Sequence, residues 1–130
     1  MTGVWLALAV ALAGGVGAAC RMVLDGFMKG WARVPYPLGT TVINVSGSLL
    51  LGFVTAVSAG LGPWAVVLGT GLLGGYTTFS TASYETVRLA QEGRWRAAVA
   101  NGFGMLVVAL AAAALGLWLG ALVGGANPGR

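Results

Sequence analysis

Polar side chains recur within one long apolar stretch of the chain, where they could contact an ion. Thr40, Asn44 and Ser48 are spaced four residues apart, so in a helix they form one polar stripe. The amide of Asn44 offers two N–H donors and one acceptor. Because a polar side chain in an apolar helix is costly and tends to mark function, two roles stay open. Asn44 either donates to an ion or makes a hydrogen bond to a neighbouring helix.

A second polar cluster follows at residues 74–81, which read GGYTTFST. Two glycines followed by two β-branched threonines disfavour a helix, so we expect a helix break over residues 74–78. Freed carbonyl groups there could bind a cation, and hydroxyl or freed N–H groups could meet an anion. The alternative is a glycine kink in which the hydroxyls bond back to the preceding turn.

The rest of the chain is strongly apolar. Of its 130 residues 58% are hydrophobic, 23 are glycine and only 8% are charged, whereas a soluble domain carries about 25% charged residues. Residues 1–20, 34–84 and 97–129 contain no Asp, Glu, Lys or Arg. This composition predicts an all-α integral membrane protein with one domain over residues 1–130.

Four membrane spans account for the charge-free stretches, because about 20 apolar residues cross a bilayer as a helix. The glycine- and proline-rich residues 60–63 divide the longest stretch into two spans. Short loops make neighbouring spans antiparallel, which places Trp5, Trp64 and Trp118 at one membrane face. The expected spans are 4–24, 38–59, 64–84 and 97–123.

Glycines spaced four residues apart occur in two of these spans. Gly71 and Gly75 form one such pair, and Gly116, Gly120 and Gly124 form two more. Small residues at this spacing let helices approach closely in lipid, so we expect helix–helix contacts there.

Several function classes are excluded by composition. Seven basic residues, with no cluster of more than three, make no nucleic-acid footprint. With no histidine and one cysteine, a zinc site or a disulfide scaffold is not expected. No nucleophile is paired with a base, so we do not expect an enzyme.

Three motifs in order give the chain a specific resemblance to a known family. They are GGVGAACR at 14–21, GTTVINVSGS at 39–48, and GTGLLGGYTTFST at 69–81, which Glu85 follows. Over residues 14–104 the sequence resembles the CrcB/Fluc family of fluoride channels. The resemblance implies a passive channel of the bacterial plasma membrane that releases cytoplasmic fluoride and so lowers its toxicity. It also implies an antiparallel dimer with two pores between the subunits.

The resemblance also implies roles for individual residues. Asn44 matches the family's pore asparagine, Phe79 matches the first of two pore phenylalanines, and Arg21 matches an arginine near the aqueous entrance. Hydroxyl groups of Ser80 and Thr81 would face the anion path. The family holds a structural sodium ion at the dimer interface, and its ligands match two backbone groups of this chain. They are the backbone carbonyls of Gly74 and Thr77.

Two features depart from the family pattern. Ala82 stands where the second phenylalanine is usual, and residues 106–116 contain only alanine, leucine, valine and glycine, where the family places pore hydroxyls. A pore lined by this subunit alone is therefore in question.

The basic residues are distributed unevenly between the two sides of the expected bundle. Six lie in the first and third loops or beside them, and only Arg130 lies on the other side. The positive-inside rule then places both termini outside the cytoplasm. Such a bias favours a related CrcB-like partner in the opposite orientation, while a second copy of this chain stays the alternative. The six are Arg21, Lys29, Arg33, Arg88, Arg94 and Arg96.

Two other functions remain as alternatives. A small proton-coupled four-helix multidrug exporter needs an acid in its first span, and residues 1–20 have none. A non-transporting membrane assembly protein would not require the expected break at residues 74–78.

Overall fold

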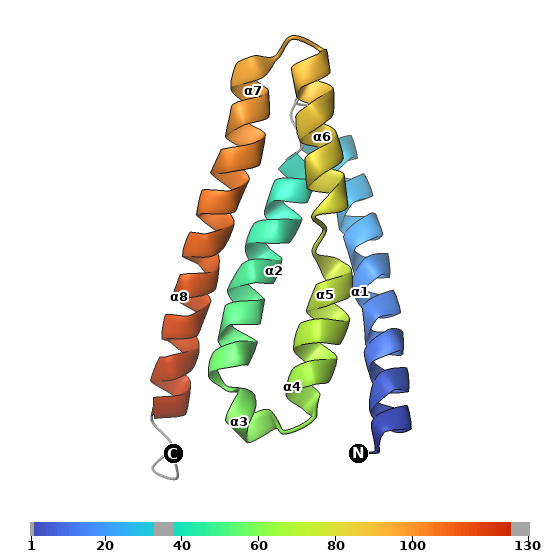
Figure 1. Cartoon of the computed structure of the whole chain (residues 1–130), viewed down its shortest axis with the longest axis vertical. Coiled ribbons are helices and arrows are strands. Elements are labelled where there is room, and N and C mark those ends of the chain that lie inside the picture. The colour runs from blue at the N-terminus through green and yellow to red at the C-terminus, as the bar shows by residue number, and fades with distance from the viewer. Residues whose placement is uncertain (1, 33–37, 126–130) are drawn as a thin grey trace.

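The fold of the chain is an antiparallel arrangement of helices, which a computed structural model describes for residues 2–32 and 38–125 (Figure 1). No strand occurs within these residues. The helices are α1 (Gly3–Ala32), α2 (Leu38–Ala56), α3 (Ser58–Leu61), α4 (Trp64–Val66), the π-helical turns η1 (Val67–Leu73), α5 (Gly74–Tyr76), α6 (Ser80–Gln91), α7 (Trp95–Val99), the π-helical turns η2 (Ala100–Gly104) and α8 (Met105–Gly125).

Three helices of the described residues are long and apolar enough to cross a membrane. They cover Gly3–Gly30, Leu38–Ala56 and Trp95–Gly124. The fourth expected span, 64–84, runs through α4, η1, α5 and the start of α6. No single helix in that stretch has the required length, because the chain leaves the helical conformation after Tyr76.

The break in this stretch is real, but it begins three residues later than the glycines predict. Gly74 is still helical, with φ −62° and ψ −39°, and the chain turns to an extended conformation at Thr77, where ψ is 160°. Helix resumes at Ser80. The glycine at 75 serves packing instead, because a Cβ there would overlap the backbone of Gly14 on α1.

Two helix ends also differ from expectation. Helix α1 continues to Ala32, past the expected end at residue 24, and its last turns carry an ion pair between Lys29 and Asp25 at 3.0 Å. Helix α2 ends at Ala56 rather than at residue 59. The turn between α3 and α4 contains Gly62 with a φ of 58°, a conformation that favours glycine.

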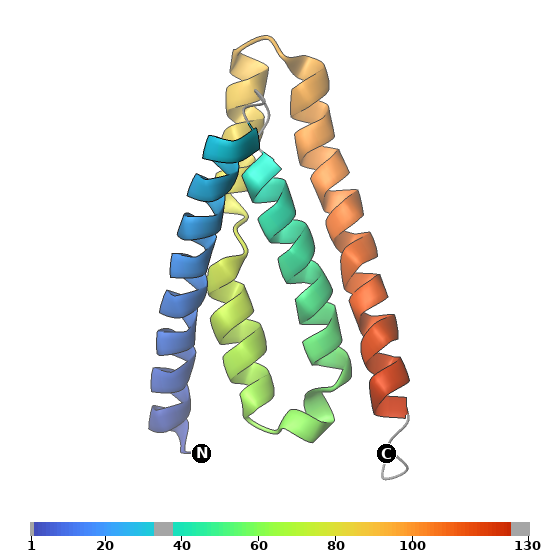
Figure 2. The same ribbon diagram turned by 180° about the vertical axis from the view of Figure 1, so that it is seen from behind.

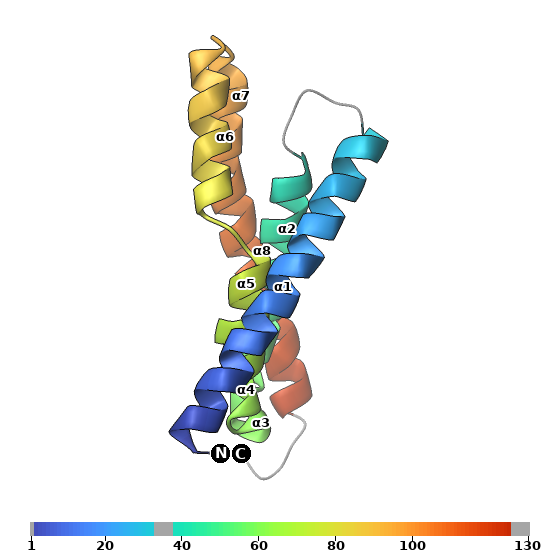
Figure 3. The same cartoon turned by 90° about the vertical axis from the view of Figure 1, so that its right-hand side faces the viewer.

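Two pairings hold the bundle together. Helix α1 packs on η1 and α5, and α2 packs on α8, so α2 lies between α8 and α5 (Figures 1 and 2). Helix α1 begins and α8 ends at the same end of the bundle, while the turn between α6 and α7 lies at the other end. Figure 3 shows that α1 and the α6–α7 hairpin diverge toward that end.

Candidate functional site

The side chain of Asn44 holds the break in place. From the middle of α2 its Nδ2 donates to the carbonyl oxygen of Thr78 at 2.8 Å, and its Oδ1 accepts the N–H of Thr78 at 2.9 Å. Nδ2 also lies 3.2 Å from Sδ of Met105 on α8. One amide thus satisfies both backbone groups of Thr78, a residue outside the helices. Of the two roles expected for Asn44, contact with an ion and a hydrogen bond to a neighbouring segment, the structure shows the hydrogen bond.

We call the paired hydrogen bonds between Asn44 and Thr78 the clamp. The clamp leaves one carbonyl group of the preceding helix without its usual donor. In a continuous helix the N–H of Thr78 would donate to the carbonyl of Gly74. Here that N–H is bonded to Asn44 instead. The carbonyl of Gly74 therefore lacks its usual helical donor, which is the state a backbone cation ligand requires.

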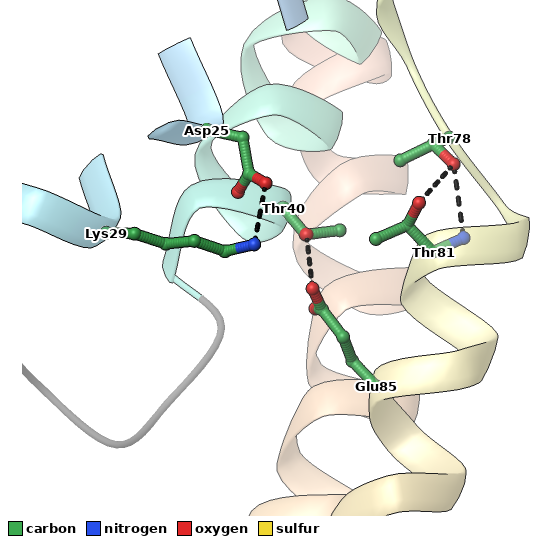
Figure 4. A network of polar contacts seen from close by, with 6 residues as sticks. All are labelled: Asp25, Lys29, Thr40, Thr78, Thr81 and Glu85. Carbon is green, nitrogen blue, oxygen red and sulfur yellow. Dashed lines mark hydrogen bonds and ion pairs between the residues drawn. The ribbon is translucent and has the colours of Figure 1, made fainter. Parts of the chain in front are cut away.

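Hydroxyl groups gather on the other side of the break, where α6 begins. The Thr78 hydroxyl accepts the N–H of Thr81 at 3.2 Å, and its Oγ1 donates to Oγ1 of Thr81 at 3.2 Å (Figure 4). Ser80 is exposed, with its Oγ 3.5 Å from that of Thr78. The N–H groups of Phe79, Ser80 and Ala82 have no acceptor within the described part of the chain. The start of α6 therefore offers O–H and N–H donors together.

Arg21 reaches the break from α1. Its Nη1 donates to the carbonyl oxygen of Thr77 at 3.2 Å, and the arginine is half-buried. A carbonyl oxygen has two lone pairs, so Thr77 keeps one for another partner. Of the two carbonyl groups expected to hold sodium, that of Gly74 therefore lacks its helical donor, and that of Thr77 accepts one hydrogen bond from Arg21.

Phe79 projects from the non-helical segment and is 87% exposed. It lies at an open groove of about 530 Å³ between α2, α6, η2 and α8. The groove is mostly apolar, and its polar lining residues include Asn44, Ser48 and Asn101. Its lining residues are Asn44, Ser48, Leu51, Thr77, Thr78, Phe79, Ala82, Ser83, Thr86, Val87, Asn101, Gly102, Met105, Leu106 and Ala109.

The lining of the groove also contains a polar pair, Asn101 and Thr86, that the motifs do not reveal. Asn101, in η2, is 1% exposed. Its Nδ2 donates to Oγ1 of Thr86 at 2.8 Å and to the carbonyl of Ala82 at 3.3 Å. The signal in the sequence is a lone amide in a charge-free apolar stretch. The expected fourth span therefore places one polar side chain, that of Asn101, at the groove. The apolar residues 106–116 follow it in the sequence.

A second pair, also missed from the sequence, connects α2 to α6. The hydroxyl of Thr40 donates to Oε1 of Glu85 at 3.0 Å (Figure 4), and Thr40 is 1% exposed. All three members of the polar stripe therefore face the broken segment or its groove. Thr40 meets Glu85, Asn44 meets Thr78, and Ser48 lines the groove.

Residues 8–117 match the family described as CrcB-like protein, Camphor Resistance (CrcB). The chain belongs to the CrcB family. This match contains the clamp, the break and the groove. The three motif segments of this CrcB chain supply Arg21, Asn44 and the broken segment, which meet at Thr77 and Thr78.

Curated relatives of this CrcB chain carry a more specific name. Fluoride-specific ion channel FluC 1 of Leifsonia xyli subsp. xyli is 59% identical over 124 residues, which cover 93% of this chain and 90% of the relative. FluC 2 of Cutibacterium acnes is 48% identical, over 95% of this chain and all of the relative. FluC 2 of Mycolicibacterium paratuberculosis is 46% identical with the same coverage.

Proposed function

We propose that this chain is a subunit of a fluoride channel that releases cytoplasmic fluoride passively and so lowers its toxicity. The observation that carries the proposal is the break at Thr77–Phe79, clamped by Asn44 inside an apolar bundle. Non-helical backbone at membrane depth is tolerated only where protein buries it or where it lines a hydrated cavity. The relatives are named fluoride-specific ion channels, and this supports fluoride as the transported ion. The chain is not an enzyme.

The path proposed for the anion follows the groove past the start of α6. A small anion needs donors that replace its water, and the O–H groups of Ser80 and Thr81 lie beside the free N–H groups of the break. Phe79 offers the positive edge of its ring, which favours an anion without binding it tightly. Weak, repeated contacts of this kind permit conduction. Asn44 contributes by keeping the break open, and Arg21 adds positive charge near Thr77.

The membrane arrangement proposed has four crossings, and the third is the broken stretch of residues 64–84, from α4 to the start of α6. Exposed tryptophans support it. Trp5, Trp64 and Trp118, on α1, α4 and α8, are each more than half exposed at the same end of the bundle, and Trp95 is exposed at the other. Aromatic side chains favour the membrane–water interface. We place the protein in the plasma membrane of a bacterium.

A second subunit in the opposite orientation completes the proposed channel. Large apolar side chains remain exposed along α1 and α8, and the groove that Phe79 borders is open on one side. The partner is either a second copy of this chain or a related CrcB-like subunit. The related subunit accounts better for the loop charges and for Ala82.

A sodium ion is the structural cofactor proposed for this dimer. The carbonyls of Gly74 and Thr77 would hold it, because Thr78 N–H no longer engages the first and Arg21 takes only one lone pair of the second. A bound cation raises the local potential for anions. A sodium-dependent rise in the thermal unfolding temperature of the purified protein, absent with a large organic cation, tests this assignment.

Fluoride efflux from liposomes tests the function itself. Vesicles loaded with fluoride receive this chain alone, or this chain with a related subunit, and a fluoride electrode follows release. We expect release from at least one preparation and none from chloride-loaded vesicles followed with a chloride electrode. Absence of fluoride release from both preparations would contradict the proposal. Release that requires a proton gradient would favour the exporter instead.

A further inference from the structure

Glu85 is a carboxylate placed one helical turn beyond the hydroxyl groups of the break. It follows Thr81 by four residues on α6, so both side chains lie on one helix face. Thr81 bonds to Thr78, and Glu85 accepts from Thr40 (Figure 4). A charge on Glu85 is therefore close to the donors that the proposed anion path uses.

The second oxygen of Glu85 has no donor. Its Oε2 is buried and makes no hydrogen bond within residues 2–32 and 38–125. A buried carboxylate oxygen without a donor disfavours the ionised form. A proton on Oε2 would remove that cost.

The charged groups around Glu85 form ion pairs with each other rather than with Glu85. On α1, Lys29 is paired with Asp25 at 3.0 Å. On α6, Arg88 is paired with Glu92 at 3.2 Å. On α2, Thr40 is the only polar contact of Glu85 among the described residues. No cation within the described chain forms an ion pair with Glu85 itself.

These surroundings shift the acidity of Glu85, which lies just beyond the expected third span. Burial raises the pKa of its carboxyl above the usual range, and nearby Asp25 raises this pKa further. The Thr40 hydrogen bond and the positive charges of Lys29 and Arg88 lower the pKa without cancelling the rise. Glu85 therefore takes up a proton at a higher pH than an exposed glutamate does.

We propose that Glu85 is a positioning residue whose ionisation controls the passage of the anion past the break. This inference rests on the proposed fluoride conduction. Ionised Glu85 holds the Thr40 hydroxyl as its donor, and its negative charge opposes an anion at Ser80 and Thr81. Protonated Glu85 no longer repels the anion, and the Thr40 hydroxyl is free to turn toward it.

The test measures fluoride efflux from liposomes at a series of pH values from mildly acidic to mildly alkaline. The wild-type chain, Glu85→Gln and Glu92→Gln are compared. Protein-free vesicles at each pH give the leak of hydrogen fluoride, which is subtracted. Glu92→Gln is the matched control, because Glu92 is an exposed acid of the same helical region.

We expect the wild-type rate to rise several-fold as the pH falls. Glu85→Gln should be fast at every pH. Glu92→Gln should keep a slope, with its midpoint at the same or a lower pH, because it frees Arg88, whose charge lowers the pKa of Glu85. Thr40→Val should move the midpoint to higher pH, because the lost hydrogen bond stabilised the ionised form. Glu85→Asp, which keeps a carboxyl, should retain a slope.

Three results would overturn the inference. They are a flat wild-type profile, an unchanged slope in Glu85→Gln, and a flat profile in Glu85→Asp. If Glu85→Gln does not fold, the profiles of Glu85→Asp and Thr40→Val still decide whether Glu85 is the titrating group. Fluoride release that is constant with pH leaves the proposed channel function intact and removes only the role of Glu85. Absence of release at every pH contradicts both.

Discussion

Asn44 combines properties that no other residue offers at its position. The amide donates to one backbone group of Thr78 and accepts from the other. Aspartate would lose the donor, and leucine would lose both. The clamp explains why an amide, rather than a hydroxyl, occupies the centre of the polar stripe on α2.

Replacing Asn44 with alanine should therefore reduce both stability and fluoride flux. The substitution leaves the N–H and the carbonyl of Thr78 without partners, and each unpartnered buried group costs about 1–3 kcal/mol. Thermal unfolding in detergent and fluoride efflux measure the two effects. Thr55→Ala is the matched control, because Thr55 is an exposed polar residue of α2 that bonds to the carbonyl of Leu51. If Asn44→Ala matched Thr55→Ala in both measurements, Asn44 would not hold the break.

The sequence predicts which residues matter near the break better than it predicts their contacts. Asn44, Ser80 and Thr81 stand out because polar groups are rare in this chain. The partner of Asn44 depends on the register of α2 against α5 and α6, which no local pattern encodes. For the same reason, the sequence alone does not predict the contacts of Glu85 and Asn101. Each becomes informative only when a residue of another helix, Thr40 or Thr86, lies beside it.

At the scale of elements, glycine lets helix backbones touch where they cross. Gly75 of α5 faces the backbone of Gly14 on α1, and Gly116 of α8 faces the backbone of Leu49 on α2. A side chain at either glycine would overlap a carbonyl oxygen of the neighbouring helix. Close packing of this kind stabilises helices in lipid, where the hydrophobic effect does not drive them together.

Gly75→Ala should separate α1 from α5 and lower the unfolding temperature and the flux. Overpacking of a tight contact costs about 1–3 kcal/mol. Gly15→Ala is the control, because a Cβ at Gly15 has no atom within 4 Å. Circular dichroism during heating compares the two variants. Equal unfolding temperatures would show that α1 and α5 do not pack backbone against backbone at Gly75.

Hydropathy predicts the long helices well, because composition alone decides whether a stretch can cross a membrane. The sequence predicts the position of the helix break after α5 less well. The glycines at 74 and 75 indicated a break, but packing against α1 keeps them helical, and the chain opens at Thr77. The π-helical turns η1 and η2 carry no signal in the sequence, since one extra residue in a turn is set by contacts between helices.

At the scale of the molecule, the two ends of the bundle differ in charge. The end that holds the α6–α7 turn carries Arg88, Arg94 and Arg96, and the late turns of α1 add Lys29. The start of α1 and the end of α8 lie at the opposite end. Within the described residues, no basic side chain lies at that opposite end. Insertion into a membrane responds to this difference.

We predict one dominant orientation, with the start of α1 and the end of α8 outside the cytoplasm. Lys and Arg cost roughly 2.5–3.5 kcal/mol at a helix centre, so basic residues beside a span resist translocation. An antiparallel dimer would then need a partner with a different charge distribution, which could also supply the aromatic ring missing at Ala82. Single cysteines at Lys29→Cys and Gly125→Cys, each in a Cys20→Ala background, report the orientation in intact cells.

An impermeant thiol reagent should label position 125 strongly and position 29 weakly. Lysed cells provide the control, because both cysteines should then react if both are accessible. Strong labelling at 125 alone supports a related subunit as the partner, because a single orientation cannot form an antiparallel pair with itself. Comparable labelling at the two positions in intact cells would show that the chain inserts both ways. The channel would then be a dimer of two identical chains, and Ala82 would have to be accommodated by both of its pores.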